Sequence, residues 1–215
     1  MAQLAKTVII SNIMQPITVV FFGISGSGKG TQVELLEKYL AANDSSCGIL
    51  RPEMGNLLRA FMQTGTLLGK KIGEILAAGG LVPSFMPITL LVQMMNDSFS
   101  GTQHLLLDGT CRRPDQSRAV NDLARLWGRT SLQAIVLNLS QEVAKERLVA
   151  RGRFDDAKDD AIASRFAWYT EQVVPSIEEL RSLGWTIHEI DGSPDADTIH
   201  RNILSALGLT DPTTH

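Results

Sequence analysis

Cysteine is scarce in this sequence, and long apolar runs are missing from it. Cys47 and Cys111 are its two cysteines, too few and too far apart for a disulfide framework or a cysteine-based metal cluster. This favours a reducing compartment, so we expect a cytoplasmic protein. No uninterrupted apolar run approaches the roughly 20 residues of a membrane span, so no membrane association is expected.

The first residues also lack the features of a secretion signal. Residues 1–16 hold one lysine and a short apolar patch at Val8–Ile10, but no long apolar segment. We interpret them as an N-terminal extension. A length of 215 residues then suits one large domain at 17–215.

An excess of positive charge is missing too. The formal net charge is -3 at pH 7. A general nucleic-acid binder needs a basic surface to neutralise phosphates, so no nucleic-acid partner is expected.

A glycine-rich stretch, Gly23–Thr31, stands between a β-type run at 17–22 and an amphipathic helical pattern. Its glycines let successive backbone N–H groups turn inward around an anion, and the following helix adds partial positive charge. Lys29 would supply a full charge to the β- and γ-phosphates of a nucleoside triphosphate. The stretch therefore predicts a phosphate-binding loop for ATP, and its expected contact residues are Gly26, Ser27, Gly28, Lys29, Gly30 and Thr31.

Strand-like apolar runs alternate with helical patterns along the chain. Near-continuous apolar runs are typical of parallel strands covered on both faces. The alternation indicates an α/β protein with a doubly wound parallel sheet. The expected strands are 17–22, 48–50, 104–107, 132–137 and 185–190.

Two segments interrupt this alternation. The first has only helical patterns, at 54–64, 68–78 and 84–98, and such an insertion suits a lid, a binding flap or a long crossover. The second is the charged loop Arg151–Asp156. It leads into a helix at 158–182. We expect this helix to bend near Pro175, because proline removes a helix hydrogen bond.

Charged residues gather at the ends of these elements. A strand that ends in Asp108 would place a carboxylate beside the phosphate loop, where it can hold the water shell of Mg²⁺. Guanidinium groups bind phosphate oxygens bidentately and neutralise charge on a transferring phosphoryl group. The arginines near the interruptions and element ends are Arg59, Arg112, Arg113, Arg147, Arg151, Arg153 and Arg165.

Several motifs together resemble those of one family. The G-K-G-T-Q sequence of the phosphate loop is similar to that of nucleoside monophosphate kinases. Gly55–Arg59 resembles the motif T-G-D-M-L-R, and Gly79–Pro83 resembles A-G-K-L-V. Asp108–Gln116 resembles D-G-F-P-R…Q. From about residue 17 to 208 the chain thus resembles the adenylate kinase-like nucleoside monophosphate kinases.

The resemblance implies an acceptor domain at about 51–82. Arg59 and Arg112 would hold the acceptor phosphate. Gln116 would read the edge of the base, as in members that select AMP. The other residues implied in binding the monophosphate are Met54, Gly55, Gly80, Leu81, Val82 and Gly109.

The resemblance also implies a donor side. Arg147 and Arg151 would contact ATP, and the lid at about 151–160 would be of the short kind, without a zinc-binding insertion. Ser193 and Pro194 would lie in the loop whose backbone reads the donor adenine. A structural role also explains these two residues: Ser193 would be the N-cap of a helix and Pro194 its first residue. The implied catalytic residues are Lys29, Arg112, Arg153 and Arg165.

The implied fold is a five-stranded parallel sheet in the order 2-3-1-4-5. The implied protein is a monomer that transfers the γ-phosphoryl group of Mg·ATP to a nucleoside monophosphate, with AMP as the expected acceptor. Because the acceptor phosphate is already an anionic nucleophile, no general base is required.

Some residues depart from the family motifs. Met54 replaces a small or hydroxyl residue, Asn56 replaces an aspartate, and Thr110 and Cys111 replace Phe-Pro. The spacing between Arg153 and Arg165 is one residue longer than the family motif leads us to expect. These departures leave three alternatives open: a UMP/CMP or other nucleotide kinase, a non-catalytic ATP-binding paralogue, and a kinase for a non-nucleotide metabolite.

Overall fold

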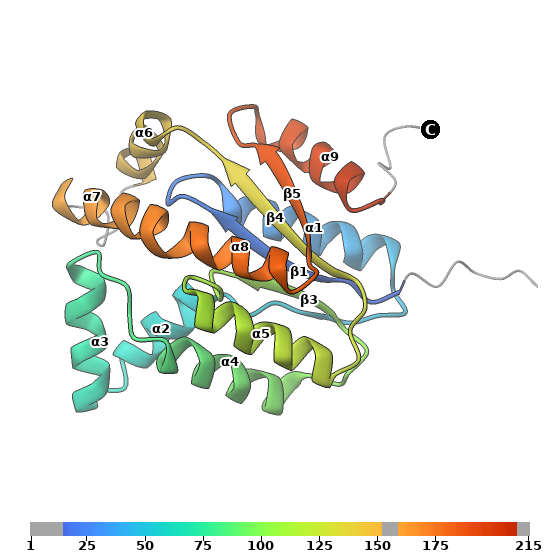
Figure 1. Cartoon of the computed structure of the whole chain (residues 1–215), viewed down its shortest axis with the longest axis horizontal. Coiled ribbons are helices and arrows are strands. Elements are labelled where there is room, and N and C mark those ends of the chain that lie inside the picture. The colour runs from blue at the N-terminus through green and yellow to red at the C-terminus, as the bar shows by residue number, and fades with distance from the viewer. Residues whose placement is uncertain (1–14, 152–158, 210–215) are drawn as a thin grey trace, which may run out of the picture.

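A parallel sheet of five strands forms the centre of the computed structural model, which describes residues 15–151 and 159–209. Neighbouring strands run parallel in the order β2-β3-β1-β4-β5 (Figure 1). This order and the α/β class confirm the prediction from the sequence. The strands are β1 (Thr18–Gly23), β2 (Ile49–Leu50), β3 (His104–Asp108), β4 (Leu132–Asn138) and β5 (Thr186–Asp191).

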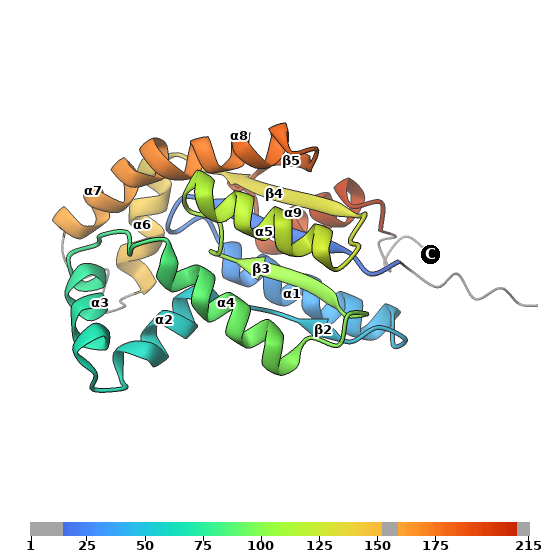
Figure 2. The same cartoon turned by 60° about the horizontal axis from the view of Figure 1, so that its bottom comes forward.

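The central strand β1 sends alternate side chains into two layers of helices, because successive residues of a strand point to opposite faces. Val19 and Phe21 pack in a core cluster with α1 and α9. Val20 and Phe22 pack in a second cluster with α5 and α8. Figures 1 and 2 show the two pairs of helices on opposite faces of the sheet. The helices are α1 (Lys29–Asn43), α5 (Pro114–Leu126), α8 (Val174–Ser182) and α9 (Ala196–Ala206).

A helical insertion separates β2 from β3, as the sequence predicted. Its helices place Leu58, Ile72 and Leu91 in the core cluster that also contains α5 and α8, so the insertion packs firmly against that layer. Thr66 precedes the second of these helices and accepts a hydrogen bond from the N–H of Gly69 at 3.0 Å, which caps its first turn. The helices are α2 (Met54–Met62), α3 (Leu67–Ala77) and α4 (Phe85–Ser98).

The helix predicted at 158–182 is interrupted. α7 (Asp159–Trp168) leads into the π-helical turn η2 (Tyr169–Val173), which leads directly into α8. The wide turn comes just before Pro175, whose ring would clash with the carbonyl group four residues earlier in a regular helix. The predicted irregularity therefore lies one turn ahead of the proline.

Helix α6 (Gln141–Arg151) packs against α7. Their contact is a small apolar cluster that includes Leu148, Ile162 and Phe166. The segment 152–158, with most of the predicted lid and Arg153, lies outside the described residues. Within the described ranges, no helix combines the length and apolar character needed to cross a bilayer.

Helix α9 begins later than the sequence suggested. Its N-cap is Asp195, whose carboxylate accepts the N–H of Thr198 at 2.8 Å. Ser193 instead donates its backbone N–H to Asp191 at 2.9 Å. The prediction of Ser193 as N-cap and Pro194 as the first helical residue is therefore wrong. A carboxylate interacts more strongly than a hydroxyl with the positive end of a helix dipole.

Buried polar side chains connect the amino ends of β1 and β3. Nδ1 of the fully buried His104 accepts the N–H of Ile17 at 3.1 Å, so Nε2 carries the proton and donates it to Asp44 at 3.1 Å. Arg129 donates to Oγ1 of Thr18 and to the carbonyl of Ile17, each at 2.9 Å. Burial lowers the pKa of both His104 and Arg129.

Candidate functional site

The glycine-rich loop predicted to bind phosphate joins the carboxyl end of β1 to α1. Gly26 and Gly28 both have a φ of 89°, a left-handed conformation that glycine adopts without strain. A Cβ at Gly26 would also lie 2.5 Å from the carbonyl oxygen of Ala144. The loop conformation therefore depends on glycine at these positions.

Lys29 is the first residue of α1. Its ammonium group donates to the carbonyl oxygens of Gly23 and Ile24, the second at 3.2 Å, so the side chain lies back over the loop. The N–H groups of the first turn of α1 add the positive end of the helix dipole. Loop, helix end and ammonium group together offer N–H donors and positive charge that suit an anion.

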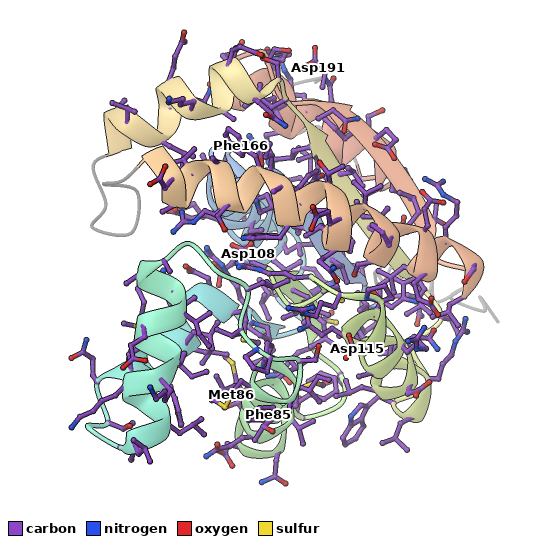
Figure 3. All side chains as sticks on the ribbon, turned by 60° about the vertical axis from the view of Figure 1, so that its left-hand side comes forward. Phe85, Met86, Asp108, Asp115, Phe166 and Asp191 are labelled. Carbon is purple, nitrogen blue, oxygen red and sulfur yellow. The ribbon has the colours of Figure 1, made fainter. Side chains whose placement is uncertain are left out.

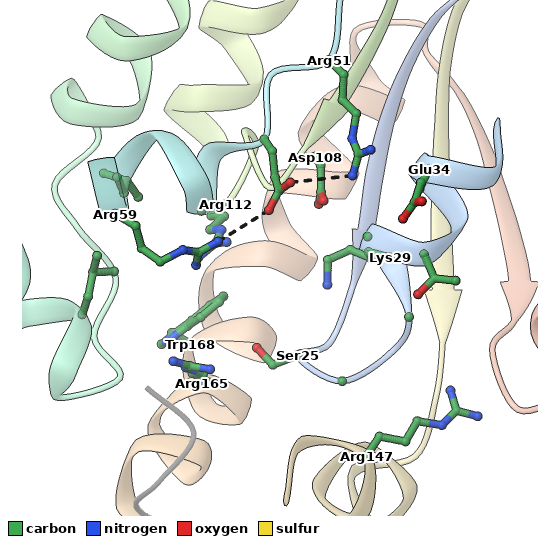
Figure 4. A pocket seen from close by; sticks show the side chains of 18 of the residues that line it. Ser25, Lys29, Glu34, Arg51, Arg59, Asp108, Arg112, Arg147, Arg165 and Trp168 are labelled. Carbon is green, nitrogen blue, oxygen red and sulfur yellow. Dashed lines mark ion pairs between the residues drawn. The ribbon is translucent and has the colours of Figure 1, made fainter. Parts of the chain in front are cut away.

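A cavity of about 560 Å³ lies beside this loop (Figure 4). In Figure 3 Asp108 is seen between the helical insertion and α7. Basic residues outnumber acidic ones by six to three among the side chains lining the cavity, which suits a polyanionic ligand. The basic residues are Lys29, Arg51, Arg59, Arg112, Arg147 and Arg165, and the acidic ones are Glu34, Glu53 and Asp108.

Carboxylates line the cavity next to the phosphate loop. Asp108 ends β3, and Glu53 forms an isolated parallel bridge with it, so the two acidic residues are on adjacent backbone segments. A Cβ at Gly30 would lie 3.9 Å from Oδ2 of Asp108, so glycine leaves the space between loop and carboxylate open. Hard oxygen donors beside a phosphate site suit Mg²⁺, which binds through one or two carboxylates, water and phosphate.

Two arginines flank Glu53. Its carboxylate lies 3.7 Å from Nη2 of Arg51 and 3.5 Å from Nη2 of Arg59, and the dashed lines in Figure 4 mark these ion pairs. Arg51 also donates to Glu37 at 2.8 Å, and Arg59 donates to the side chain of Asn56. The Arg59 guanidinium is therefore directed into the cavity by neighbours on its own segment.

Arg112 enters the cavity from the loop after β3. Its Nε donates to the carbonyl of Gly109 at 3.1 Å, and its backbone N–H donates to Oε1 of Gln116 at 2.8 Å. Its guanidinium lies over Trp168, 5.4 Å from the ring centroid. The amide of the buried Gln116 also donates to the hydroxyl of Ser84 at 3.4 Å. Gln116 thus supports the loop that carries Arg112.

Two further arginines come from α6 and α7, the helices before and after residues 152–158. Arg147 of α6 donates to the carbonyls of Gly192 at 3.0 Å and Ser193 at 3.3 Å, which connects α6 to the loop after β5. Arg165 of α7 is 9% exposed and lines the cavity. Arginines distant in the sequence thus converge on one space.

The cavity brings together most of the site residues predicted from the sequence. Those lining it are Gly26, Gly28, Lys29, Gly30, Thr31, Gly55, Arg59, Gly80, Asp108, Arg112, Arg147 and Arg165.

Other predicted residues do not line the cavity. Ser27, Met54, Val82 and Gln116 are buried, and the more exposed Leu81, Gly109, Ser193 and Pro194 adjoin the segments described above. The Arg151 side chain and all of Arg153 fall outside the described part of the chain.

Seven lining residues were not among the site residues predicted from the sequence. Arg51 and Glu53 directly follow β2, and the rule that ligands bind at the carboxyl ends of parallel strands could have indicated them. Trp168 gives no such signal, because it lies at the end of a helix distant in the sequence. The seven are Ser25, Glu34, Arg51, Glu53, Leu58, Leu76 and Trp168.

Cys111 lies close to this site but is not suited to nucleophilic chemistry. Its side chain is buried, and burial raises the pKa of its thiol to about 12. The reactive form of cysteine is the thiolate, which is negligible at neutral pH with such a pKa. The site is instead suited to binding and neutralising phosphate groups.

Comparison with known proteins gives a consistent result. The family model described as Adenylate kinase matches residues 21–184. A curated relative named Adenylate kinase from Mycobacterium tuberculosis (strain ATCC 25177 / H37Ra) is 33% identical over 192 residues, 88% of this chain and 98% of the relative. Relatives of the same name from Prochlorococcus marinus (strain NATL1A) and Corynebacterium glutamicum (strain R) are 30% identical over 191 and 190 residues. These matches likewise cover 88% of this chain and 98% of each relative.

Proposed function

The chain belongs to the adenylate kinase family and is a nucleoside monophosphate kinase, and from this premise we propose that it converts ATP and AMP into two molecules of ADP. The observation that carries the proposal is the single cavity in which Lys29 of the phosphate loop, Arg59 and Arg112 all take part. Two phosphate chains brought end to end need positive charge at both ends of such a space.

On the donor side, the phosphate loop would bind the β- and γ-phosphates of ATP through its backbone N–H groups and Lys29. Arg147 is held by the carbonyls of the loop after β5 and lines the cavity, where it would contact ATP. We propose the backbone at Ser193 and Pro194 as the contact for the donor base, and Arg151 as a further contact to ATP.

On the acceptor side, Arg59 and Arg112 would bind the phosphate of AMP. Both are held by hydrogen bonds to nearby groups, so little side-chain freedom is lost on binding. The segment 51–82 would form the acceptor domain, with the adenine placed near Gln116 and the backbone of Gly80–Val82. The side chain of Met54 is buried in the core, so Met54 would contact AMP through its backbone.

The reaction needs no proton transfer. An oxygen of the acceptor phosphate forms a bond to the γ-phosphorus, and the bond from the γ-phosphorus to the β,γ-bridging oxygen breaks, leaving ADP on each side. Lys29, Arg112, Arg153 and Arg165 would neutralise the charge on the transferring group. The catalytic contribution of the protein is thus alignment and charge neutralisation.

A magnesium ion accompanies ATP in this family. The oxygen donors beside the phosphate loop fit it, and Asp108 would hold it through water. When bound, Mg²⁺ neutralises charge on the β- and γ-phosphates.

A panel of acceptors tests the proposed reaction. Wild-type protein is incubated with Mg·ATP and each of AMP, CMP, UMP, GMP and the deoxynucleoside monophosphates, and diphosphate product is measured. We expect AMP to react fastest. Faster conversion of UMP or CMP would reassign the acceptor, and ATP binding without any conversion would identify a non-catalytic protein.

The variant Arg112→Ala tests the acceptor side of the site. Loss of a charge-assisted hydrogen-bonding group costs about 1.5–3 kcal/mol, so we expect the acceptor KM to rise about 10- to 100-fold while the ATP KM stays within about twofold. Arg118→Ala is the matched control, because Arg118 pairs with Glu179 at the surface and does not line the cavity. An equal rise in both KM values for Arg112→Ala would contradict the assignment.

A further inference from the structure

The acceptor side of the cavity has an aromatic residue that the sequence motif does not supply. Where the family motif has Phe-Pro, this chain has Thr110 and Cys111, which are both buried and do not line the cavity. Trp168, at the end of α7, lines the cavity instead. It lies with Arg59, Gly80 and Arg112 among the lining residues, so an indole ring faces the acceptor end.

The ring of Trp168 supports Arg112. The guanidinium carbon lies 5.4 Å from the ring centroid, within the range of a cation–π contact, while Nε of the same group donates to Gly109 at 3.1 Å. Two independent contacts thus fix the guanidinium of Arg112. Figure 4 shows Trp168 beside Arg112 and Arg165.

The indole N–H of Trp168 binds the loop after α3. Nε1 donates to the carbonyl of Gly79 at 2.9 Å. Gly79 has a φ of +69°, and a Cβ there would lie 2.5 Å from the carbonyl oxygen of Ala161 in α7. Loop and helix are therefore in backbone contact, and Trp168 connects them at the point where Gly80 enters the cavity.

We propose that Trp168 is a positioning residue for the acceptor nucleotide. Its ring holds Arg112 in place for the acceptor phosphate, and its N–H holds the loop that begins at Gly79. This inference rests on the proposed function, because it assigns a role on the acceptor side of the same site. It predicts that acceptor binding depends on Trp168 and that binding of ATP does not.

Steady-state kinetics separates the two halves of this role. Trp168→Leu removes ring and N–H, and a cation–π contact of about 1–2 kcal/mol corresponds to a rise in the acceptor KM of about tenfold. Trp168→Phe keeps an aromatic ring, so its acceptor KM should rise by about threefold at most. The ATP KM should stay within about twofold for both variants.

Trp127→Leu is the matched control for these substitutions. Trp127 packs edge-to-face on Phe99, with ring centroids 5.2 Å apart, and does not line the cavity. Its loss should leave both KM values unchanged. A Trp168→Leu protein with an unchanged acceptor KM, or with equal rises in both KM values, would overturn the proposal.

Tryptophan fluorescence gives a readout that does not depend on turnover. Adding AMP to wild-type protein should change the emission, because the guanidinium over Trp168 acquires a phosphate partner. The change should vanish in Trp168→Phe and persist in Trp127→Phe. An AMP-induced change that persists in Trp168→Phe would contradict the role of Trp168.

The two proposals fail in different ways. If wild-type protein converts no nucleoside monophosphate, the proposed function fails. If it converts AMP but Trp168→Leu and Trp168→Phe match it in acceptor KM and in fluorescence response, the role of Trp168 alone is wrong.

Discussion

Glu53 places a negative charge between two guanidinium groups, at the end of the cavity where we propose that the acceptor phosphate binds. Its ion pairs with Arg51 and Arg59 are 3.7 and 3.5 Å long. An acceptor phosphate would approach Arg59 against the repulsion of this carboxylate. We therefore expect Glu53 to weaken acceptor binding.

Replacing Glu53 with glutamine should tighten acceptor binding. Partly exposed ion pairs contribute about 0.2–1 kcal/mol, so we expect Glu53→Gln to lower the acceptor Kd about threefold, measured by calorimetry. Glu37→Gln is the control, since Glu37 also pairs with Arg51, at 2.8 Å, but does not line the cavity. Weaker acceptor binding by Glu53→Gln would mean that the carboxylate serves chiefly to orient Arg59.

Single residues differ in how far the sequence could place them. Lys29 and Arg112 belong to local motifs whose spacing predicted their place in the site, and both line the cavity. Glu53 and Trp168 belong to no such motif. Glu53 reaches the cavity because it follows β2 and bridges the end of β3. Trp168 reaches it because α7 approaches the loop after α3, a tertiary contact that no local pattern encodes.

The contact between the loop after α3 and α7 depends on a glycine, Gly79. At Gly79 the backbone has a positive φ and passes so close to Ala161 that a Cβ would lie 2.5 Å from its carbonyl oxygen. The carbonyl of Gly79 also accepts the indole N–H of Trp168. Glycine at this position therefore lets the loop after α3 meet α7, the helix that carries Arg165.

A pair of glycine variants isolates this contact. Gly65 has a φ of +70° with no atom near a would-be Cβ, so Gly65→Ala and Gly79→Ala carry similar backbone strain and only the second carries a clash. We expect Gly79→Ala to raise the acceptor KM about tenfold and to lower Tm by several degrees more than Gly65→Ala. Equal effects of the two variants on both measurements would show that the close approach is unimportant.

Regular elements were easier to predict than their ends. All five strands were found from strand-like runs. The runs of β1, β3 and β4 are near-continuously apolar because these strands are covered on both faces. The phosphate loop followed from glycine spacing. The start of α9 was wrong because Asp195 outcompetes Ser193 for the N-cap position. The position of the π-helical turn before Pro175 could not be predicted from the sequence. Tertiary packing determines which residues of a helix change conformation to accommodate a proline.

The stability of the whole molecule should depend on pH through its buried histidine. Burial lowers the pKa of His104 below the ordinary 6.5, so the ring stays neutral in the folded state. Below pH 6.5 the unfolded chain binds more protons, and stability is lost as the pH falls toward the lowered folded value. Hydrogen bonds, first from Ser46, lower the pKa of Asp44, so its contribution is lost only in more acidic solution.

Thermal unfolding across pH tests this linkage. For one histidine the free energy of unfolding changes by at most about 1.4 kcal/mol per pH unit, so Tm should fall by about 3–5 °C per unit below pH 6.5. His104→Gln should be less stable at neutral pH and show a flatter decline. His188→Gln is the comparison: burial also lowers the pKa of His188, but its half-buried ring should contribute less. If Tm of His104→Gln fell with pH as steeply as that of the wild type, groups other than His104 would cause the pH dependence.

The position of β1 at the centre of the sheet has a consequence for biosynthesis. Thr18 pairs with Leu105 of β3 and Leu132 of β4, which are both translated after the entire helical insertion. At about 5–20 residues per second, the strand leading into the phosphate loop leaves the ribosome on the order of ten seconds before its second neighbour exists. Through that interval we expect Val19–Phe22 to be an apolar strand segment without its partners, and so a segment of the nascent chain that a chaperone can bind.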